Sequence, residues 1–182
     1  LLGSLGGIYL QMGLIDAARE ALGRAVELGR LQDNPRQLAS HLSDHGFTLL
    51  LSDHPAAAIP VLGEALARLE PVEPRDRRLA SEILSMLGSA QLRTGRLREA
   101  EENMLRSLAH AEAADGERSV AYARCVGALA EVELRTNRLD EAERDSRRSL
   151  AILRELLSED SADVIGASSF VTEQQARAFA NL

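Results

Sequence analysis

The sequence predicts an all-α protein, a right-handed superhelical α-solenoid of about four helix-turn-helix units followed by one more helix. Leu and Ala dominate the apolar residues, whereas aromatic residues make up only 3% and Trp is absent, a composition that favours helices. Four turn-forming residues recur at spacings of 40, 42 and 42: Gly13, Asp53, Gly95 and Asn137. Small and apolar residues return in the same register on both sides of these turns, and such internal repetition indicates a repeat protein.

The segment after each turn has the pattern of one helix face. Its repeated positions lie two, five and nine residues after the turn, steps that place side chains on one side of a helix. They hold Ile15, Pro55, Leu97 and Leu139; then Ala18, Ala58, Ala100 and Ala142; then Leu22, Leu62, Met104 and Ser146. Alanine recurs four times at one position, which indicates that two helices cross closely there.

The segment before each turn predicts a second helix with a small residue in its middle. The repeated positions lie seven, eight and eleven residues before the turn. They hold Gly6, Gly46, Gly88 and Ala130; then Leu5, His45, Leu87 and Leu129; then Leu2, Leu42, Leu84 and Val126. Because Gly costs about 1 kcal/mol in a helix interior, its repeated use suggests that packing requires a small residue.

Polar connectors with Pro, Gly or Asp divide the chain into units of about 1–33, 35–74, 76–115 and 117–159 within a single domain. Residues 162–182 predict an extra or capping helix with Val164, Phe170, Val171 and Phe179 as its apolar residues. Because the sequence starts with Leu inside an apolar periodic segment, we expect a fragment of a larger protein.

These residues resemble the tetratricopeptide repeat (TPR) family. The best matches are Leu5, Gly6, Tyr9, Ala18, Leu22 and Ala25 in the first unit and Leu84, Leu87, Gly88, Ala100 and Met104 in the third. A period near 42 is similar to the kinesin-light-chain type, which residues 139–164 match most closely. The departures are His45, Ala130 and Ser146 at repeat positions, and Pro60, which we expect to kink its helix.

The resemblance implies a concave groove lined by the first helix of each unit, which would bind a protein or peptide. The candidate groove residues are Gln11, Asp44, Phe47, Leu51, Ser85, Ser89, Arg93, Glu131 and Arg135. Arg93 and Arg135 hold equivalent positions, where they could grip a carboxylate or an acidic stretch of peptide beside the apolar Phe47. The alternative is that both are solvated helix ends, since exposed Arg is common.

The family's clamp for a C-terminal carboxylate needs Lys and Asn at set groove positions. Those positions hold Gly3, Gly7, Asp44 and Glu82, or Ser43, Phe47, Met86 and Arg124, and the chain has no Lys. The Asn pairs frequent in first helices of the kinesin-light-chain type are also missing. We therefore expect neither a receptor for chaperone tails nor that route of cargo-peptide recognition.

The candidates for chemistry favour structural roles, so we expect no enzyme, catalytic residue, metal or cofactor. His41, Asp44 and His45 lie within one helical turn, but a two-His metal site needs a third ligand and a positioned base. Cys125 stands next to an inner position and is read as a small buried hydrophobe. The glycines Gly3, Gly6 and Gly7 do not follow a strand and make no nucleotide fingerprint.

Charge and hydropathy exclude other partner classes. The net charge is −7 and the pI about 5.2, which argues against direct binding of nucleic acid. No apolar run reaches the roughly 18 residues of a membrane span. A lone cysteine fits a reducing compartment, so we expect a cytoplasmic protein.

The leading function is a protein–protein interaction scaffold that binds a peptide or partner protein in its groove, as the sensory or regulatory part of a larger signalling or transcription regulator. The alternatives are a sensor domain for a small molecule or signalling peptide, and self-association through exposed end helices. A closed pocket would favour the small ligand, and a large apolar patch on residues 162–182 would favour oligomers.

Overall fold

The computed structural model describes residues 1–69, 76–158 and 161–180, with side chains as far as Thr172. The connector at 70–75 and the Phe179 side chain lie outside this part. The described residues form only helices and no strands. The helices are α1 (Leu2–Gln11), α2 (Ile15–Gly29), α3 (Pro35–Leu51), α4 (Pro55–Leu69), α5 (Arg77–Arg93), α6 (Leu97–Asp115), α7 (Val120–Arg135), α8 (Leu139–Leu156) and α9 (Ala162–Ala180).

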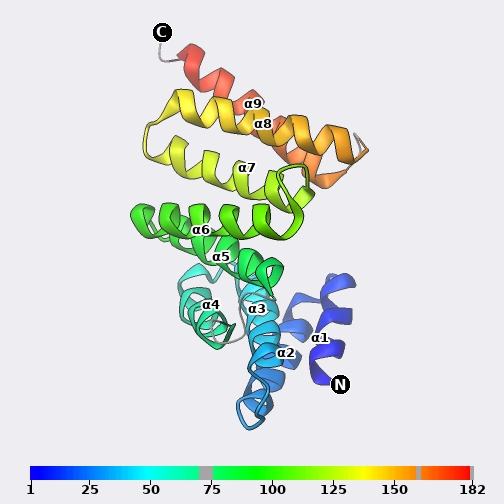
Figure 1. The fold of residues 1–182 in the computed structure, drawn as a ribbon. Helices are drawn as coiled ribbons and strands as arrows, with labels where there is room; N and C mark the ends of the chain where they lie inside the picture. The colour runs from blue at the N-terminus through cyan, green and yellow to red at the C-terminus, as the bar shows by residue number, and fades with distance from the viewer. Residues whose placement is uncertain (70–75, 159–160, 181–182) are drawn as a thin grey trace.

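The helices form hairpins that stack in chain order. Within each hairpin the first helix packs on the second, and the second packs on the first helix of the next hairpin. Figure 1 shows the stack running from the blue N-terminal helices to the red α9, with the helix direction turning along the way. The first helices α1, α3, α5 and α7 also contact one another in sequence. This arrangement confirms the predicted all-α repeat solenoid.

All four predicted corners adopt the left-handed backbone conformation that tight helix endings require. The φ angles are 71° at Gly13, 59° at Asp53, 78° at Gly95 and 62° at Asn137. In each case the N–H of the following residue donates to the carbonyl five residues earlier at 2.8–2.9 Å, and the corner N–H donates three residues back. These two bonds are the Schellman ending of a helix. The corners are therefore equivalent, as predicted.

The small residues of the first helices allow close helix crossing. A Cβ atom at Gly6 would lie 2.4 Å from Leu22, and one at Gly46 would lie 2.4 Å from Leu62. A Cβ atom at Gly88 would lie 3.0 Å from Met104. Each glycine thus faces the large apolar residue nine positions after its own corner, which confirms the steric reason inferred from the repeat.

In the fourth hairpin, a different pair of residues occupies the two positions where the helices cross. Ala130 takes the glycine position and Ser146 takes the large apolar position, and both are buried. The Ser146 hydroxyl is satisfied within its own helix, where it donates to the carbonyl of Ala142. An added methyl group on one helix therefore coincides with a smaller side chain on the other, so the two departures from the pattern form one compensated exchange.

The other departures are accommodated locally. His45 is half-buried and packs over Gly23, where an added Cβ would lie 3.7 Å from the imidazole. Helix α4 continues through the exposed Pro60. The kink expected at this proline stays a prediction.

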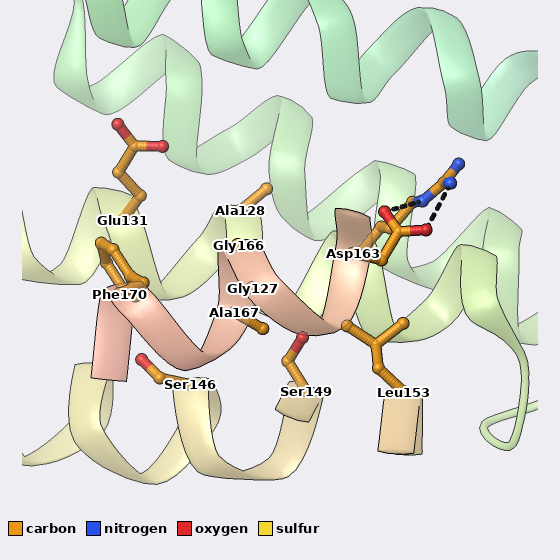
Figure 2. A pocket seen from close by; sticks show the side chains of 11 residues that line it. Gly127, Ala128, Glu131, Ser146, Ser149, Leu153, Asp163, Gly166, Ala167 and Phe170 are labelled. Carbon is orange, nitrogen blue, oxygen red and sulfur yellow. Dashed lines mark hydrogen bonds and ion pairs between the residues drawn. The ribbon is translucent and has the colours of Figure 1, made fainter. Parts of the chain in front are cut away.

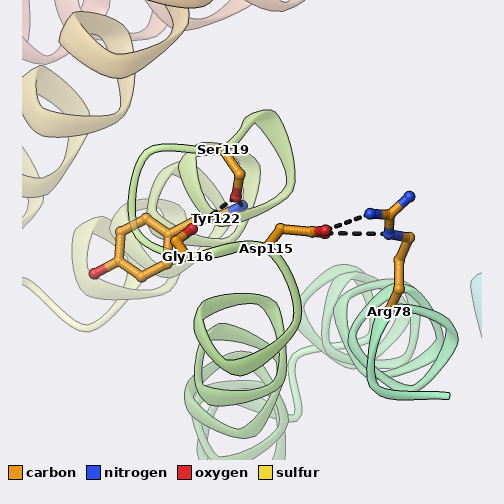
Figure 3. A network of polar contacts seen from close by, with 5 residues as sticks. All are labelled: Arg78, Asp115, Gly116, Ser119 and Tyr122. Atoms are coloured by element: carbon orange, nitrogen blue, oxygen red, sulfur yellow. Dashed lines mark hydrogen bonds and ion pairs between the residues drawn. The ribbon is translucent and has the colours of Figure 1, made fainter. Parts of the chain in front are cut away.

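A short connector joins α6 to α7 and fixes their relative direction (Figure 3). Gly116 ends α6 with a φ of 79°, which is readily available only to glycine. Ser119 caps α7, because its hydroxyl accepts the N–H of Tyr122 at 3.2 Å and donates to the carbonyl of Gly116 at 2.8 Å. Arg78 at the start of α5 pairs with Asp115 at the end of α6. Caps and ion pairs thus hold the hairpin ends in place.

Candidate functional site

The first helices α3, α5 and α7 line an open hollow of about 360 Å³, which we call the central cavity. It is lined by first helices alone, and therefore by the face that the sequence predicts as the binding groove. Its lining residues are Ser43, Asp44, Phe47, Ser81, Glu82, Ser85, Met86, Ala121, Arg124 and Cys125.

The central cavity combines apolar surface with two carboxylates. Phe47 is 41% exposed although it is aromatic, and Met86 is half-buried beside it in the lining. Burial raises the pKa of the Asp44 carboxyl. Burial also raises the pKa of Glu82, with the charge of Arg78 opposing this and that of Asp44 adding to it. Glu82 is exposed by surface area, yet the surrounding groove removes enough water to disfavour its charged form.

The only cation in this lining is already engaged. Arg124 donates from Nε and Nη2 to the two carboxylate oxygens of Asp163 at 2.9 and 2.7 Å. This bidentate pair joins α7 to the start of α9. The structure gives Asp44 and Glu82 no hydrogen bond or ion pair within the described part of the chain, so the central cavity carries excess negative charge.

A second cavity of about 230 Å³ lies one unit further along, between α7, α8 and α9. Figure 2 shows Glu131 and Phe170 toward one end of it and Asp163 at the other. Asp163 is the residue that pairs with Arg124. Gly127 and Ala128 occupy the positions that Ser85 and Met86 hold one unit earlier. Because these side chains are smaller, the cavity reaches Ser146, Ser149 and Leu153 on α8. The same hollow therefore recurs at equivalent positions of adjacent units.

The predicted groove residues fall into three groups. Asp44, Phe47 and Ser85 line the central cavity, whereas Glu131 lines the second one. Gln11, Leu51, Arg93 and Arg135 are exposed at equivalent positions near the corner ends of their helices, and Ser89 is half-buried on α5. Neither cavity includes these five residues.

The sequence reasoning did not count Glu82, Met86 and Arg124 among the groove candidates. It considered them only as positions where the carboxylate clamp is missing. One signal could have found them: Glu82 and Arg124 are equivalent, each three residues before a lining position held by Ser85 or Gly127. That step keeps them on the same helix face.

Arg93 and Arg135 differ chemically although they are equivalent in the repeat. Arg93 donates to the carbonyl of Leu50 at 2.9 Å and pairs with Asp53, the corner of the preceding hairpin. For Arg135 the preceding corner is Gly95, which has no carboxylate. In the described part of the chain, Arg135 makes no hydrogen bond or ion pair, so its guanidinium is the one available to a partner.

The other candidates for chemistry are embedded in packing. Burial lowers the pKa of both His41 and His45 and so favours their neutral forms. The Cys125 thiol is buried and contacts the Ser107 hydroxyl at 3.1 Å. Among the residues that the structure describes, no cluster of His, Cys, Asp or Glu could hold a metal ion. Nor does any helix there have the length and apolarity needed to cross a membrane.

Sequence comparison identifies the repeats. Models of the tetratricopeptide repeat match residues 1–28 and residues 79–155, together more than half of the chain. Among curated proteins, no sequence matches the chain.

Solved structures share the whole solenoid. A Podosopora anserina protein described as a kinesin light chain with nearly identical TPR-like repeats superposes with a TM-score of 0.73 at 16% identity, covering 97% of this chain and 85% of that one. BtubC (BKLC) from P. vanneervenii superposes with a TM-score of 0.69 at 22% identity, covering 92% of this chain and 74% of that one. MamA superposes with a TM-score of 0.61 at 17% identity, covering 97% of this chain and 95% of that one.

These likenesses agree with the repeat solenoid described above. Repeats of this kind form protein-interaction scaffolds, which are generally not enzymes. The chain belongs to the tetratricopeptide repeat family, with repeats of the long, kinesin-light-chain-like form.

Proposed function

We propose that this chain binds a peptide segment of a partner protein in the groove along its first helices. The observation that carries the proposal is the central cavity, an open hollow of about 360 Å³ that places an exposed Phe47 beside polar side chains. Exposed aromatic surface next to polar groups is typical of binding sites. The second cavity at the equivalent position extends the same surface along α7 and α9.

We further propose that the array is the sensory or regulatory part of a larger signalling or transcription regulator. A ligand held between α3, α5 and α7 touches three consecutive hairpins, so it can change how they stack. Small-angle scattering tests this step: binding of a peptide should change the radius of gyration of the array. An unchanged scattering profile at saturation would argue for passive tethering.

A random peptide library displayed on phage tests groove binding directly. Peptides selected on the wild-type protein should lose affinity for Ser85→Tyr, which fills the central cavity. They should keep their affinity for Ala109→Tyr, which adds the same ring at an exposed position of α6 outside both cavities. If the wild-type protein selects no peptides, or if Ser85→Tyr binds them as well as the wild type does, groove binding is rejected.

Self-association through an end helix is the second candidate, because α1 exposes a row of apolar side chains. Leu5, Ile8 and Met12 are 37%, 51% and 65% exposed and follow one another at helical steps. Sedimentation at increasing concentration tests it, with Ile8→Glu as the variant that should abolish a dimer. A protein that sediments as a monomer throughout excludes this candidate.

A further inference from the structure

We infer that the partner segment presents a Lys or Arg side chain, which enters the central cavity between Asp44 and Glu82, next to an apolar residue that packs on Phe47 and Met86. The inference rests on the proposed function and specifies the chemistry of the partner. The expected ligand is a peptide with cationic and apolar residues, whereas the sequence alone suggested that the groove binds an acidic peptide.

The charges of the lining favour a cation. Asp44 and Glu82 come from adjacent first helices and repel each other, and neither has a hydrogen bond or ion pair in the described part of the chain. The nearby cations are committed elsewhere, Arg124 to Asp163 and Arg78 to Asp115. An ammonium or guanidinium group entering the cavity would be attracted by both carboxylates, in a site where protein has replaced part of the water.

A hydroxyl in the lining provides a second indication of a ligand. Ser43 is only 4% exposed and lines the central cavity, yet its hydroxyl makes no hydrogen bond to any residue that the structure describes. Its oxygen is therefore left for a ligand or water in the cavity to satisfy. A serine oxygen accepts hydrogen bonds, and the N–H groups of Lys and Arg are donors without acceptor capacity. The same ligand group therefore satisfies Ser43 and the two carboxylates.

The apolar part of the lining fits the rest of such a segment. The long aliphatic stems of Lys and Arg pack on apolar surface while their charged ends reach polar groups. Phe47 and Met86 provide this surface beside the carboxylates, and a cation near an aromatic ring gains further attraction. An acidic residue would instead face two carboxylates here, so acidic partners are confined to the corner end of the groove, near Arg135.

The experiment uses the peptides selected on the wild-type protein. We expect them to be enriched in Lys or Arg beside an aromatic or aliphatic residue. In fluorescence anisotropy, the variant Asp44→Asn with Glu82→Gln should bind them about tenfold more weakly. The matched control is Glu20→Gln with Glu102→Gln, which makes the same change in net charge at exposed positions of α2 and α6 and should bind as the wild type does.

A change in the peptide completes the test. Replacing the selected Lys by norleucine, or Arg by citrulline, should weaken binding to the wild type about tenfold but should not weaken binding to the Asp44→Asn, Glu82→Gln variant any further. Thermal melting followed by circular dichroism checks that each variant is folded.

The outcomes separate the inference from the proposed function. If the selected peptides lose affinity for Ser85→Tyr but show no preference for Lys or Arg, the inference is overturned and groove binding is kept. Equal affinity of the wild type and the Asp44→Asn, Glu82→Gln variant overturns it as well. Failure of the wild type to select any peptide overturns both.

Discussion

Replacing Gly46 by Ala should destabilise the protein because the helix crossing leaves no room for a methyl group. The new Cβ would lie 2.4 Å from Cδ2 and 2.6 Å from Cγ of Leu62. Leu62 is fully buried, so it cannot swing into solvent. Overpacking of a close-packed core costs about 1–3 kcal/mol. The gain from replacing Gly by Ala within a helix is about 1 kcal/mol, so it offsets only part of this cost.

Gly63→Ala is the matched control, because a Cβ at Gly63 would meet nothing within 4 Å apart from its chain neighbours and the backbone of its own helix. It lies inside α4 and receives the same gain in helix propensity without the clash. The two variants should therefore differ by about 1–3 kcal/mol, with Gly46→Ala the less stable. For a chain of this size each kcal/mol moves the melting temperature by about 2–4 °C.

Thermal unfolding followed by circular dichroism measures this difference. Adding Leu62→Ala to Gly46→Ala should cost less than Leu62→Ala alone, because the smaller side chain removes the overlap. A Gly46→Ala protein that melts as high as Gly63→Ala would refute the close-crossing argument.

Four other variants test separate parts of the structure. Pro60→Ala should raise the free energy of unfolding by about 1–2 kcal/mol in urea titration, since it restores a helical hydrogen bond at an exposed position; a lower urea midpoint contradicts this. Glu133→Gln introduces the residue type that Gln91 has at the equivalent position of the preceding unit. It should raise the free energy of unfolding by about 1 kcal/mol at pH 7, because Glu133 has a buried, unsatisfied oxygen and burial raises its pKa. Since a raised carboxyl pKa penalises the folded state only above the unfolded value of about 4.5, the gain should vanish below pH 4; a gain independent of pH would exclude this cause. Arg93→Ala should lower the unfolding free energy by less than about 1 kcal/mol, as expected for the loss of an exposed ion pair. Arg135→Ala should leave stability unchanged and should weaken the binding only of peptides that contain an acidic residue.

The fold could be predicted because its requirements apply to single positions. A left-handed corner is open to few residue types, so Gly13, Asp53, Gly95 and Asn137 stand out in the sequence. Close crossings likewise need small residues at fixed distances from the corners. These constraints are local, and they repeat.

The candidate site was harder to predict because its chemistry depends on pairs distant in sequence. Arg124 looks like a free groove cation until α9 brings Asp163 to it, and Arg93 looks equivalent to Arg135 until Asp53 is seen at the preceding corner. Ala130 and Ser146 looked like two separate departures from the pattern, although they compensate for each other across one interface. Repetition in the sequence identifies equivalent positions but not the partners that neutralise or compensate them.

The recurrence of one hollow in successive units gives the groove a regular pitch. Packed helices lie about 8–10 Å apart, and three residues of extended chain span about 10 Å. A segment in the polyproline II conformation has three residues per turn, so one laid across α5, α7 and α9 would bring every third side chain to a new hollow. The central cavity has two carboxylates without an ion pair to any described residue, whereas the next one has Gly127 and Ala128 in place of Ser85 and Met86 and is also lined by Leu153 and Phe170. Such a surface can measure the order and spacing of side chains in its partner, a charged residue first and a bulkier apolar one three positions away.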